Sequence, residues 1–264
     1  MGSEIISLHE WLKTPPGRYL LDWEGARFDQ AVADVFGYHA LQLGLPELPA
    51  LQNNRIPHRW LAANAFRAPL AGGAVDPRAT LVTDFAALPF PESSLDLLLL
   101  PHALELSPDP HTTLREAERV LVPEGRVVIS GFNPVSLWGL RQTRARLYRR
   151  LGVGDLYLPE AGEFIGYWRL RDWLRLLSFE VESVQFGCYR PSVRSEAWLQ
   201  RFAWMERVGE RSWPILGAVY FVVAVKRVRG MRLLGPSWKA PKVLANAPVP
   251  IANRKAHRDA HDGR

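Results

Sequence analysis

Residues 79–130 read ATLVTDFAALPFPESSLDLLLLPHALELSPDPHTTLREAERVLVPEGRVVIS. Within this stretch, residues 95–100 are almost entirely apolar, which is typical of a strand covered on both faces. Asp109 is a good helix N-cap, Pro110 suits the first helical position, and apolar residues then recur on one helical face. After a Pro-Glu-Gly turn, a second apolar run follows at 126–130. Strand, helix and strand in this order predict two parallel strands joined by a right-handed crossover.

Further strands and helices are expected on both sides of this unit. They are strands at 40–43, 79–83, 181–185 and 220–226, and helices at 5–12, 28–36, 170–177 and near 198–205. The helical spacing of Trp198, Phe202 and Met205 favours core packing over a cofactor contact. Alternating strands and helices predict an α/β fold, a doubly wound Rossmann-like sheet that is mostly parallel.

Ligands of such sheets bind at the carboxyl ends of the strands. This rule places Asp84, Pro101, His102 and the segment after Gly131 around one crevice. The candidate site is therefore expected at a single edge of the sheet.

Length and composition limit the number of domains and the cell compartment that the chain fits. Its 264 residues suffice for one large domain, and the single cysteine, Cys188, excludes an internal disulfide and indicates a reducing compartment. The first residues show no basic region followed by an apolar stretch, so no signal peptide is expected. The apolar run at 215–225 is too short for a bilayer, which takes roughly 20 residues. We expect a cytoplasmic, soluble protein.

The net charge of +6 lies in the C-terminal segment. Residues 229–264 hold a surplus of +6, and residues 1–228 are neutral. The segment is also proline-containing and lacks periodicity, which is typical of disorder. We therefore expect one domain at 1–228 and a basic, disordered tail at 229–264. Such a tail is either a solvated end or a contact for anionic lipid or nucleic acid.

The pattern of residues 79–135 resembles the type 11 group of class I S-adenosylmethionine (SAM)-dependent methyltransferases. The resemblance lies in Asp84 followed by Leu-Pro-Phe and Ser-Leu-Asp, then His-Ala-Leu-Glu from His102, Asp109-Pro110, and Arg-Val-Leu-Val-Pro-Glu-Gly at 119–125. With Gly131-Phe132-Asn133-Pro134 it is similar, more narrowly, to a proteobacterial group of uncharacterised methyltransferase-like proteins. The resemblance implies the class I fold, with an antiparallel last strand.

This resemblance also implies a cofactor and its contacts. SAM is the expected methyl donor, and a small molecule is the expected acceptor. Asp84 and Phe85 match the family positions that hold the adenine, and Pro101 and His102 match residues that line the SAM pocket. Asp84 alternatively caps the turn that follows it, and His102 is alternatively structural. Catalytic residues remain unassigned, because methyl transfer depends chiefly on alignment of the reactants.

The glycine-rich loop of the family is degenerate here. Gly44 matches its first glycine, but Gln42 stands where the family has an acid, and Leu45 and Pro46 replace small residues. Gln42 and Gly44 are kept as cofactor-binding candidates. The departures leave open an inactive methyltransferase-fold scaffold or regulatory binding protein. A nicotinamide-dependent dehydrogenase is disfavoured, because the Gly-x-Gly-x-x-Gly fingerprint is missing.

A basic cluster follows the central unit. Five arginines fall between Arg141 and Arg150 on an expected helix, with leucines on its other side. The cluster is either a solvated face or a surface for an anionic substrate, lipid or nucleic acid. The spacing of histidines and cysteine fits no metal site.

Overall fold

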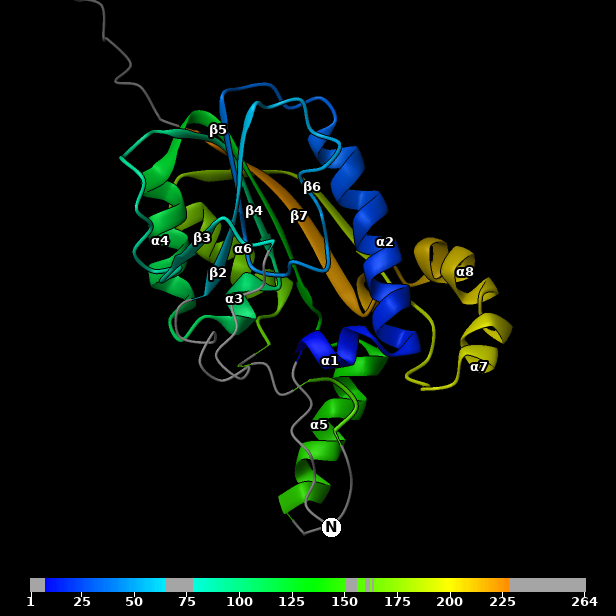
Figure 1. Ribbon diagram of the computed structural model, residues 1–264. Helices are drawn as coiled ribbons and strands as arrows, with labels where there is room; N and C mark the ends of the chain where they lie inside the picture. Colours follow the sequence, from blue (N-terminus) through cyan, green and yellow to red (C-terminus); the bar gives the residue numbers. More distant parts are fainter. Residues whose placement is uncertain (1–7, 65–77, 151–155, 160–161, 163, 228–264) are drawn as a thin grey trace, which may run out of the picture. The chain divides into compact units, whose positions relative to one another are not determined.

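The computed structural model describes residues 8–64, 78–150, 156–159, 162 and 164–227. Its sheet has seven strands in the order β3-β2-β1-β4-β5-β7-β6 (Figure 1). The strands are β1 (His39–Leu43), β2 (His58–Asn64), β3 (Leu81–Thr83), β4 (Leu95–Pro101), β5 (Leu121–Phe132), β6 (Phe179–Gly187) and β7 (Val219–Lys226). The first five strands pair in parallel, and β7 runs antiparallel between β5 and β6. The predicted doubly wound sheet is confirmed.

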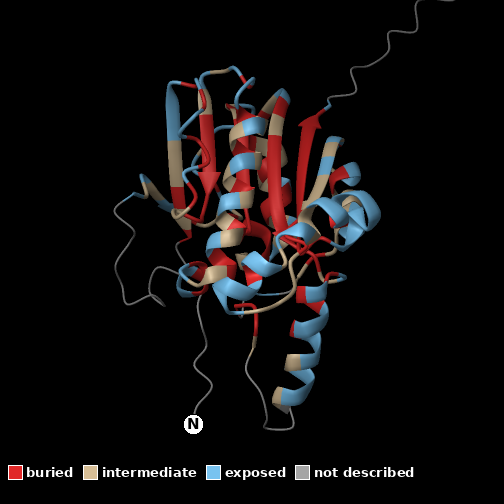
Figure 2. Ribbon diagram, turned by 90° about the vertical axis from the view of Figure 1, so that its right-hand side faces the viewer, coloured by how far each residue is buried: buried red, intermediate tan, exposed pale blue. Residues whose placement is uncertain are grey.

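Helices cover both faces of this sheet. They are α1 (Leu8–Leu12), α2 (Pro15–Val32), α3 (Ala103–Leu106), α4 (Pro110–Val120), α5 (Leu137–Arg150), α6 (Tyr167–Leu176), α7 (Glu196–Arg201) and α8 (Trp204–Ser212). Two apolar clusters divide the core: Leu97 and Leu99 of β4 face α1 and α2, whereas Leu98 and Leu100 face α4 and α6. This alternation is the period of a strand buried on both faces, and Figure 2 shows the central strands as the most deeply buried elements.

The central unit folds as expected. The Asp109 carboxylate accepts hydrogen bonds from the backbone N–H groups of His111 and Thr112, at 3.0 and 3.1 Å, and α4 begins at Pro110. The start of β5 differs from the prediction. β5 already begins at Leu121, because the Pro-Glu-Gly segment bulges within the strand instead of ending the helix.

Two helical expectations were wrong. The second N-terminal helix runs over residues 15–32 and not 28–36, because Thr14 caps it one residue before Pro15. The segment near 198–205 forms two short helices, α7 and α8. Trp198 on α7 is 52% exposed and stacks on Phe202 instead of entering the core.

The connection from β1 to β2 contains no helix. Residues 44–57 form a series of turns, whereas a parallel crossover usually carries a helix. The face of the sheet beside this connection is covered by α2, whose apolar residues join Leu45, Leu48 and Leu51 in one cluster. An N-terminal helix thus covers sheet surface that a crossover helix would otherwise cover.

The basic cluster lies on α5, which projects from the rest of the domain (Figure 1). Leu140 and Leu147 of this helix are more than half exposed, so its apolar side is not packed within the described chain. No helix among the described residues is long and apolar enough to cross a bilayer. The basic tail lies outside the described residues, and its predicted disorder and contacts stay predictions.

Candidate functional site

The carboxyl ends of the parallel strands meet at one edge of the sheet, as predicted. Gly44 follows β1, Asn64 ends β2, Asp84 follows β3 and His102 follows β4. The His102 backbone N–H donates to the carbonyl oxygen of Ser130 on β5, at 3.0 Å. The structure therefore brings the predicted site residues to a single edge.

The loop after β1 folds around the side chain of Gln42. The buried amide Nε2 donates to the backbone carbonyl oxygens of Gly44, Leu45 and Leu48, at 3.0, 3.0 and 2.8 Å. Gly44 and Leu45 both adopt left-handed backbone conformations, with φ of 73° and 51°. A carboxylate has no proton to donate to three carbonyls. The glutamine is therefore a structural requirement of this loop.

The Phe85 ring lies beside the glycine of this loop. A Cβ built on Gly44 would lie 3.6 Å from the Phe85 ring, and Phe85 itself is buried. Asp84 is half-buried, and its Oδ1 accepts the Ala86 backbone N–H at 2.9 Å. Among the described residues, its other oxygen, Oδ2, accepts no hydrogen bond. Asp84 therefore caps the turn and still presents one carboxylate oxygen.

His102 is enclosed between two carboxylates. Its Nδ1 lies 2.8 Å from Glu105 Oε2, and its Nε2 lies 3.0 Å from Glu24 Oε1 in an ion pair too poorly aligned for a hydrogen bond. All three side chains are buried. Burial alone lowers the pKa of His102, but the two carboxylates outweigh it and raise the pKa to about 10. The group thus holds an imidazolium between two carboxylates.

Residues of β5 and β7 surround the Glu105 end of this group. Glu105 Oε1 accepts the Phe132 backbone N–H. Gly131 must lack a Cβ, because one would collide with the Tyr220 hydroxyl. This buried charged group links α2 and α3 to the sheet at the carboxyl ends of the parallel strands.

Sequence reasoning missed Glu24, although a signal was present. The buried stripe of α2 consists of Leu20, Glu24, Phe28 and Val32, at intervals of four residues. A carboxylate within an otherwise apolar stripe requires a buried partner. The pattern indicates that a partner exists, but not that the partner is His102.

Comparison with known proteins relates part of the chain to the methyltransferases. The fold, with its strand order 3-2-1-4-5-7-6, is similar to that of a SAM-dependent methyltransferase from Thermotoga maritima, at a TM-score of 0.54, 18% identity, and 79% and 92% coverage of the two chains. Residues 62–129 match the family model described as a methyltransferase domain. This match covers about a quarter of the chain, and the sheet around it has the fold of the class I methyltransferases.

Two curated relatives share part of this domain. The uncharacterized protein YafS of Escherichia coli K12 is 45% identical over 94 residues, 36% of either chain. The malonyl-[acyl-carrier protein] O-methyltransferase of Halorhodospira halophila is 40% identical over 88 residues, 30% of either chain. The matches thus span about a third of the length of these relatives. The methyltransferase family match begins at residue 62, after the loop that Gln42 holds.

Of the candidate residues at this edge, some keep an accessible polar atom and others are engaged within the chain. Asp84 keeps one carboxylate oxygen without a described hydrogen bond, whereas the Phe85 ring is buried beside Gly44 at 1% exposure and presents no surface to a ligand. In the loop after β1, the Gly44 N–H donates to the Ala62 carbonyl at 2.8 Å, and the Gln42 amide is bound to the loop's own carbonyl oxygens. Among the described residues, no three potential ligands gather into a metal site.

Proposed function

We propose that this chain is a SAM-dependent methyltransferase that transfers a methyl group to a small-molecule acceptor. The observation that carries the proposal is the match at 62–129 on a sheet of the class I strand order. Bound SAM supplies an electrophilic methyl group, and the chain's contribution is to hold the donor and the acceptor in line.

The residues proposed to hold SAM divide by the part of the cofactor they would contact. Asp84 accepts a hydrogen bond from the adenine amine. Phe85 was expected to cover the adenine ring, but its own ring is 1% exposed, so it supports the loop at Gly44 from below and would reach the adenine only after a shift. Gly44 lets the backbone approach without a Cβ, and Gln42 fixes the loop that presents it. Pro101 and His102, at the end of β4, are proposed to border the same pocket.

The described geometry limits what His102 and Pro101 can contribute to the proposed pocket. The His102 side chain is fully enclosed by Glu24 and Glu105, so we propose that it fixes the shape of the β4 end and does not accept a proton from the substrate. Pro101 is buried as the last residue of β4 and has no N–H, so only its carbonyl and ring are available.

Calorimetric titration with SAM, and separately with S-adenosylhomocysteine, tests the proposal. We expect micromolar binding that weakens about tenfold, or 1.4 kcal/mol, in Asp84→Ala. Asp34→Ala is the matched control, because Asp34 is exposed beyond the end of α2 and outside the proposed contacts. Asp84→Asn retains an acceptor for the Ala86 N–H, so it separates loss of charge from loss of the turn.

The alternative, a methyltransferase-fold scaffold without SAM, would be supported by folded protein that binds neither ligand. Neither the family match nor the solved relative favours it. Equal affinities of wild type, Asp84→Ala and Asp34→Ala would instead move the cofactor contact away from β3.

A further inference from the structure

Helix α5 carries an apolar stripe that faces away from the domain. Its buried side chains, Trp138 and Gln142, lie on the face that meets the domain. The outer arc of the helix spans about 100° at 3.6 residues per turn. It holds four side chains that are between 48% and 59% exposed: Leu137, Leu140, Leu147 and Tyr148. Single exposed leucines are common on protein surfaces, but apolar residues gathered along one helical face mark a contact surface.

The apolar surface continues at the base of α5. The Asn133 Oδ1 atom accepts the backbone N–H of Val135, which is itself exposed. The Asn133 Nδ2 atom donates to the carbonyl oxygens of Ile215 and Gly217, at 2.7 and 2.9 Å. Ile215 and the neighbouring Leu216 are both exposed, so further apolar residues lie in the chain segment next to the start of α5.

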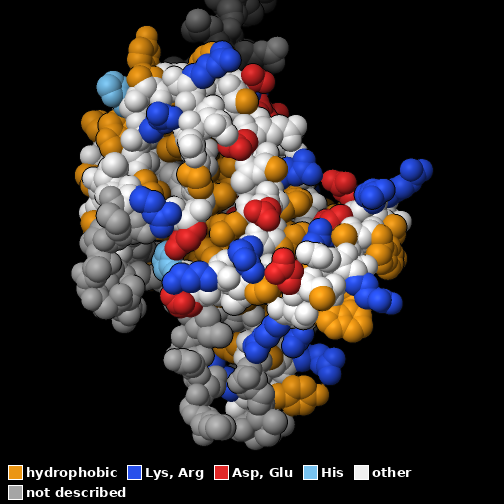
Figure 3. All heavy atoms as spheres, turned by 45° about the vertical axis from the view of Figure 1, so that its right-hand side comes forward, with side chains coloured by type: hydrophobic (Ala, Val, Ile, Leu, Met, Phe, Trp, Pro, Cys, Tyr) orange, Lys and Arg blue, Asp and Glu red, His pale blue; other side chains and the backbone are white. Residues whose placement is uncertain are grey.

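The charge of α5 is entirely positive. Its 14 residues include five arginines and no acidic residue. Arg144 lies within the apolar stripe, is exposed, and forms no ion pair with a described residue. Arg146 lies over the Phe164 ring, 5.1 Å from the centroid, and likewise forms no ion pair with a described residue. In Figure 3, basic and apolar side chains lie together on the lower, projecting part of the molecule, where no acidic side chain is visible.

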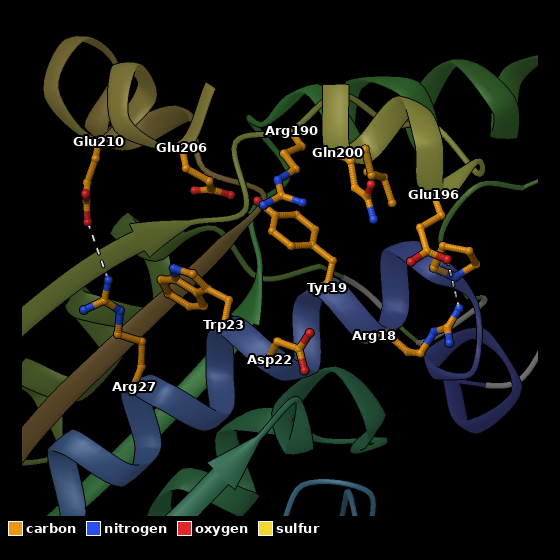
Figure 4. Close-up of a pocket in the computed structure, with 12 residues that line it drawn as sticks. Arg18, Tyr19, Asp22, Trp23, Arg27, Arg190, Glu196, Gln200, Glu206 and Glu210 are labelled. Carbon is orange, nitrogen blue, oxygen red and sulfur yellow. Dashed lines mark ion pairs between the residues drawn. The ribbon is translucent and has the colours of Figure 1, made fainter. Parts of the chain in front are cut away.

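The surface around α2, in contrast, neutralises its own charges. A cavity of about 590 Å³ lies there, and three arginines and four carboxylates line it. Arg18 lies 3.7 Å from Glu196, and Arg27 lies 3.6 Å from Glu210 (Figure 4, dashed lines). Neither of the two α5 arginines described above is paired in this way, so both are available to an anionic partner.

An anionic lipid surface matches both features of α5. Leucine and tyrosine side chains bury at the boundary between headgroups and acyl chains, while arginines bind the lipid phosphates. A nucleic acid would use the arginines but would leave the leucines in water, because phosphate contacts dominate such binding. An apolar protein partner would bury the leucines but would also have to desolvate Arg144 within the stripe. At a bilayer, the long side chain of Arg144 extends to the headgroups instead.

We propose that α5 docks the domain onto an anionic lipid bilayer. The apolar stripe would lie at the boundary between headgroups and acyl chains, with Arg144 on a lipid phosphate. Residues 229–264, with their surplus of +6, would add attraction to any anionic lipid surface. The inference does not rest on SAM binding, because no residue of α5 belongs to the proposed cofactor site.

Co-sedimentation of the full chain with lipid vesicles tests the inference. Vesicles of phosphatidylglycerol and phosphatidylcholine in equal amounts should bind the protein, and pure phosphatidylcholine vesicles should bind it at least about tenfold more weakly. Leu147→Ser should weaken binding to the mixed vesicles about tenfold, because the variant no longer buries a leucine side chain. Arg144→Gln should weaken it about fivefold. All variants retain residues 229–264, so these losses measure the contribution of α5.

Two matched controls lie on other helices. Leu176→Ser removes an exposed leucine at the end of α6, and Arg115→Gln removes an exposed arginine of α4. Neither change should alter vesicle binding. The two α5 side chains that are replaced are exposed as well, so their variants should fold, and circular dichroism checks this.

Four results would overturn the inference. The first is folded wild type that does not sediment with the mixed vesicles. The second is equal binding by wild type and Leu147→Ser, because the attraction would then be purely electrostatic. The third is binding to a DNA duplex that Arg144→Gln weakens, without binding to vesicles, which would assign α5 to nucleic acid. The fourth is self-association that Leu147→Ser abolishes, again without vesicle binding, which would show that a second copy covers the stripe.

Discussion

Removal of the buried imidazolium should destabilise the domain more than removal of either carboxylate that flanks it. The side chains of Glu24, His102 and Glu105 carry a net charge of −1 when His102 is protonated, as its pKa of about 10 requires at neutral pH. His102→Asn leaves two buried carboxylates without a cation, and a broken buried ion pair costs about 3–5 kcal/mol. Asparagine tolerates the left-handed backbone at this position, where φ is 51°. The loss in the free energy of unfolding of His102→Asn therefore measures the missing charge and not backbone strain.

Glu24→Gln provides the comparison. It leaves one imidazolium paired with one carboxylate, so its cost should be clearly smaller than that of His102→Asn. Urea denaturation followed by circular dichroism measures both free energies of unfolding. In the double variant, the cost of His102→Asn should shrink, because only one buried carboxylate then lacks a cation. A loss below about 1 kcal/mol in His102→Asn would refute the charged description of this group, since a buried pair costs more.

The pH dependence of the wild type gives an independent test. The folded-state pKa of His102 is raised above its unfolded value, so its contribution to stability is complete below pH 6.5 and lost as pH rises through about 10. Between pH 7.5 and 8.5 the free energy of unfolding should fall by about 1.4 kcal/mol. Burial also raises the pKa of the Cys188 thiol, so a higher pH would mix in a second group. A flat profile in this window would contradict the raised pKa.

Two further predictions concern Gln42 and Glu206. Gln42→Glu should cost about 1–3 kcal/mol, because three loop carbonyls lose their donor and face a carboxylate, and urea denaturation measures this loss. If Gln42→Glu were as stable as wild type, the loop would not need the amide of Gln42. Burial raises the pKa of Glu206 to about 7, with a smaller contribution from Glu210 and against the hydrogen bond from the Tyr189 N–H. The contribution of Glu206 to stability should therefore fall from pH 4.5 to 7. Relative to wild type, Glu206→Gln should gain on the order of 1 kcal/mol at pH 8 and less at pH 5, since Glu206 is partly exposed. The same difference between variant and wild type at both pH values, measured by urea denaturation, would contradict this prediction.

The central strand-helix-strand unit could be predicted because its signals are local. Asp109, Pro110 and the apolar runs on either side of α4 act over a few residues, and the structure has each of them in the expected role. The failure at Trp198 has a different cause. An aromatic spacing of four residues marks one helical face, but it does not say whether that face meets the core or solvent. Here α7 ends after Arg201, and its aromatic face stays exposed.

The position of the candidate site in the sheet could be predicted from the sequence, but the contacts between its residues could not. The rule for parallel sheets puts Asp84 and His102 at one edge, and they lie there. The partners of His102 come from α2 and α3, and only the tertiary packing of α2 brings Glu24 to β4. The Arg190 stack on Tyr19 likewise joins a segment after β6 to α2. Contacts between distant segments leave no periodic signal in the sequence.

Gln42 shows how a departure from a family pattern can be misinterpreted. In the sequence, a glutamine in place of an acid indicates a degraded cofactor loop. In the structure, the same glutamine makes three hydrogen bonds that only a donor can make, and Leu45 adopts a left-handed conformation that those bonds help to hold. The connection to β2 lacks a crossover helix, so the loop cannot be held by helical hydrogen bonds and needs a side chain to hold it. The glutamine and the missing helix are thus two parts of one arrangement, and the degenerate loop is no argument by itself against SAM binding.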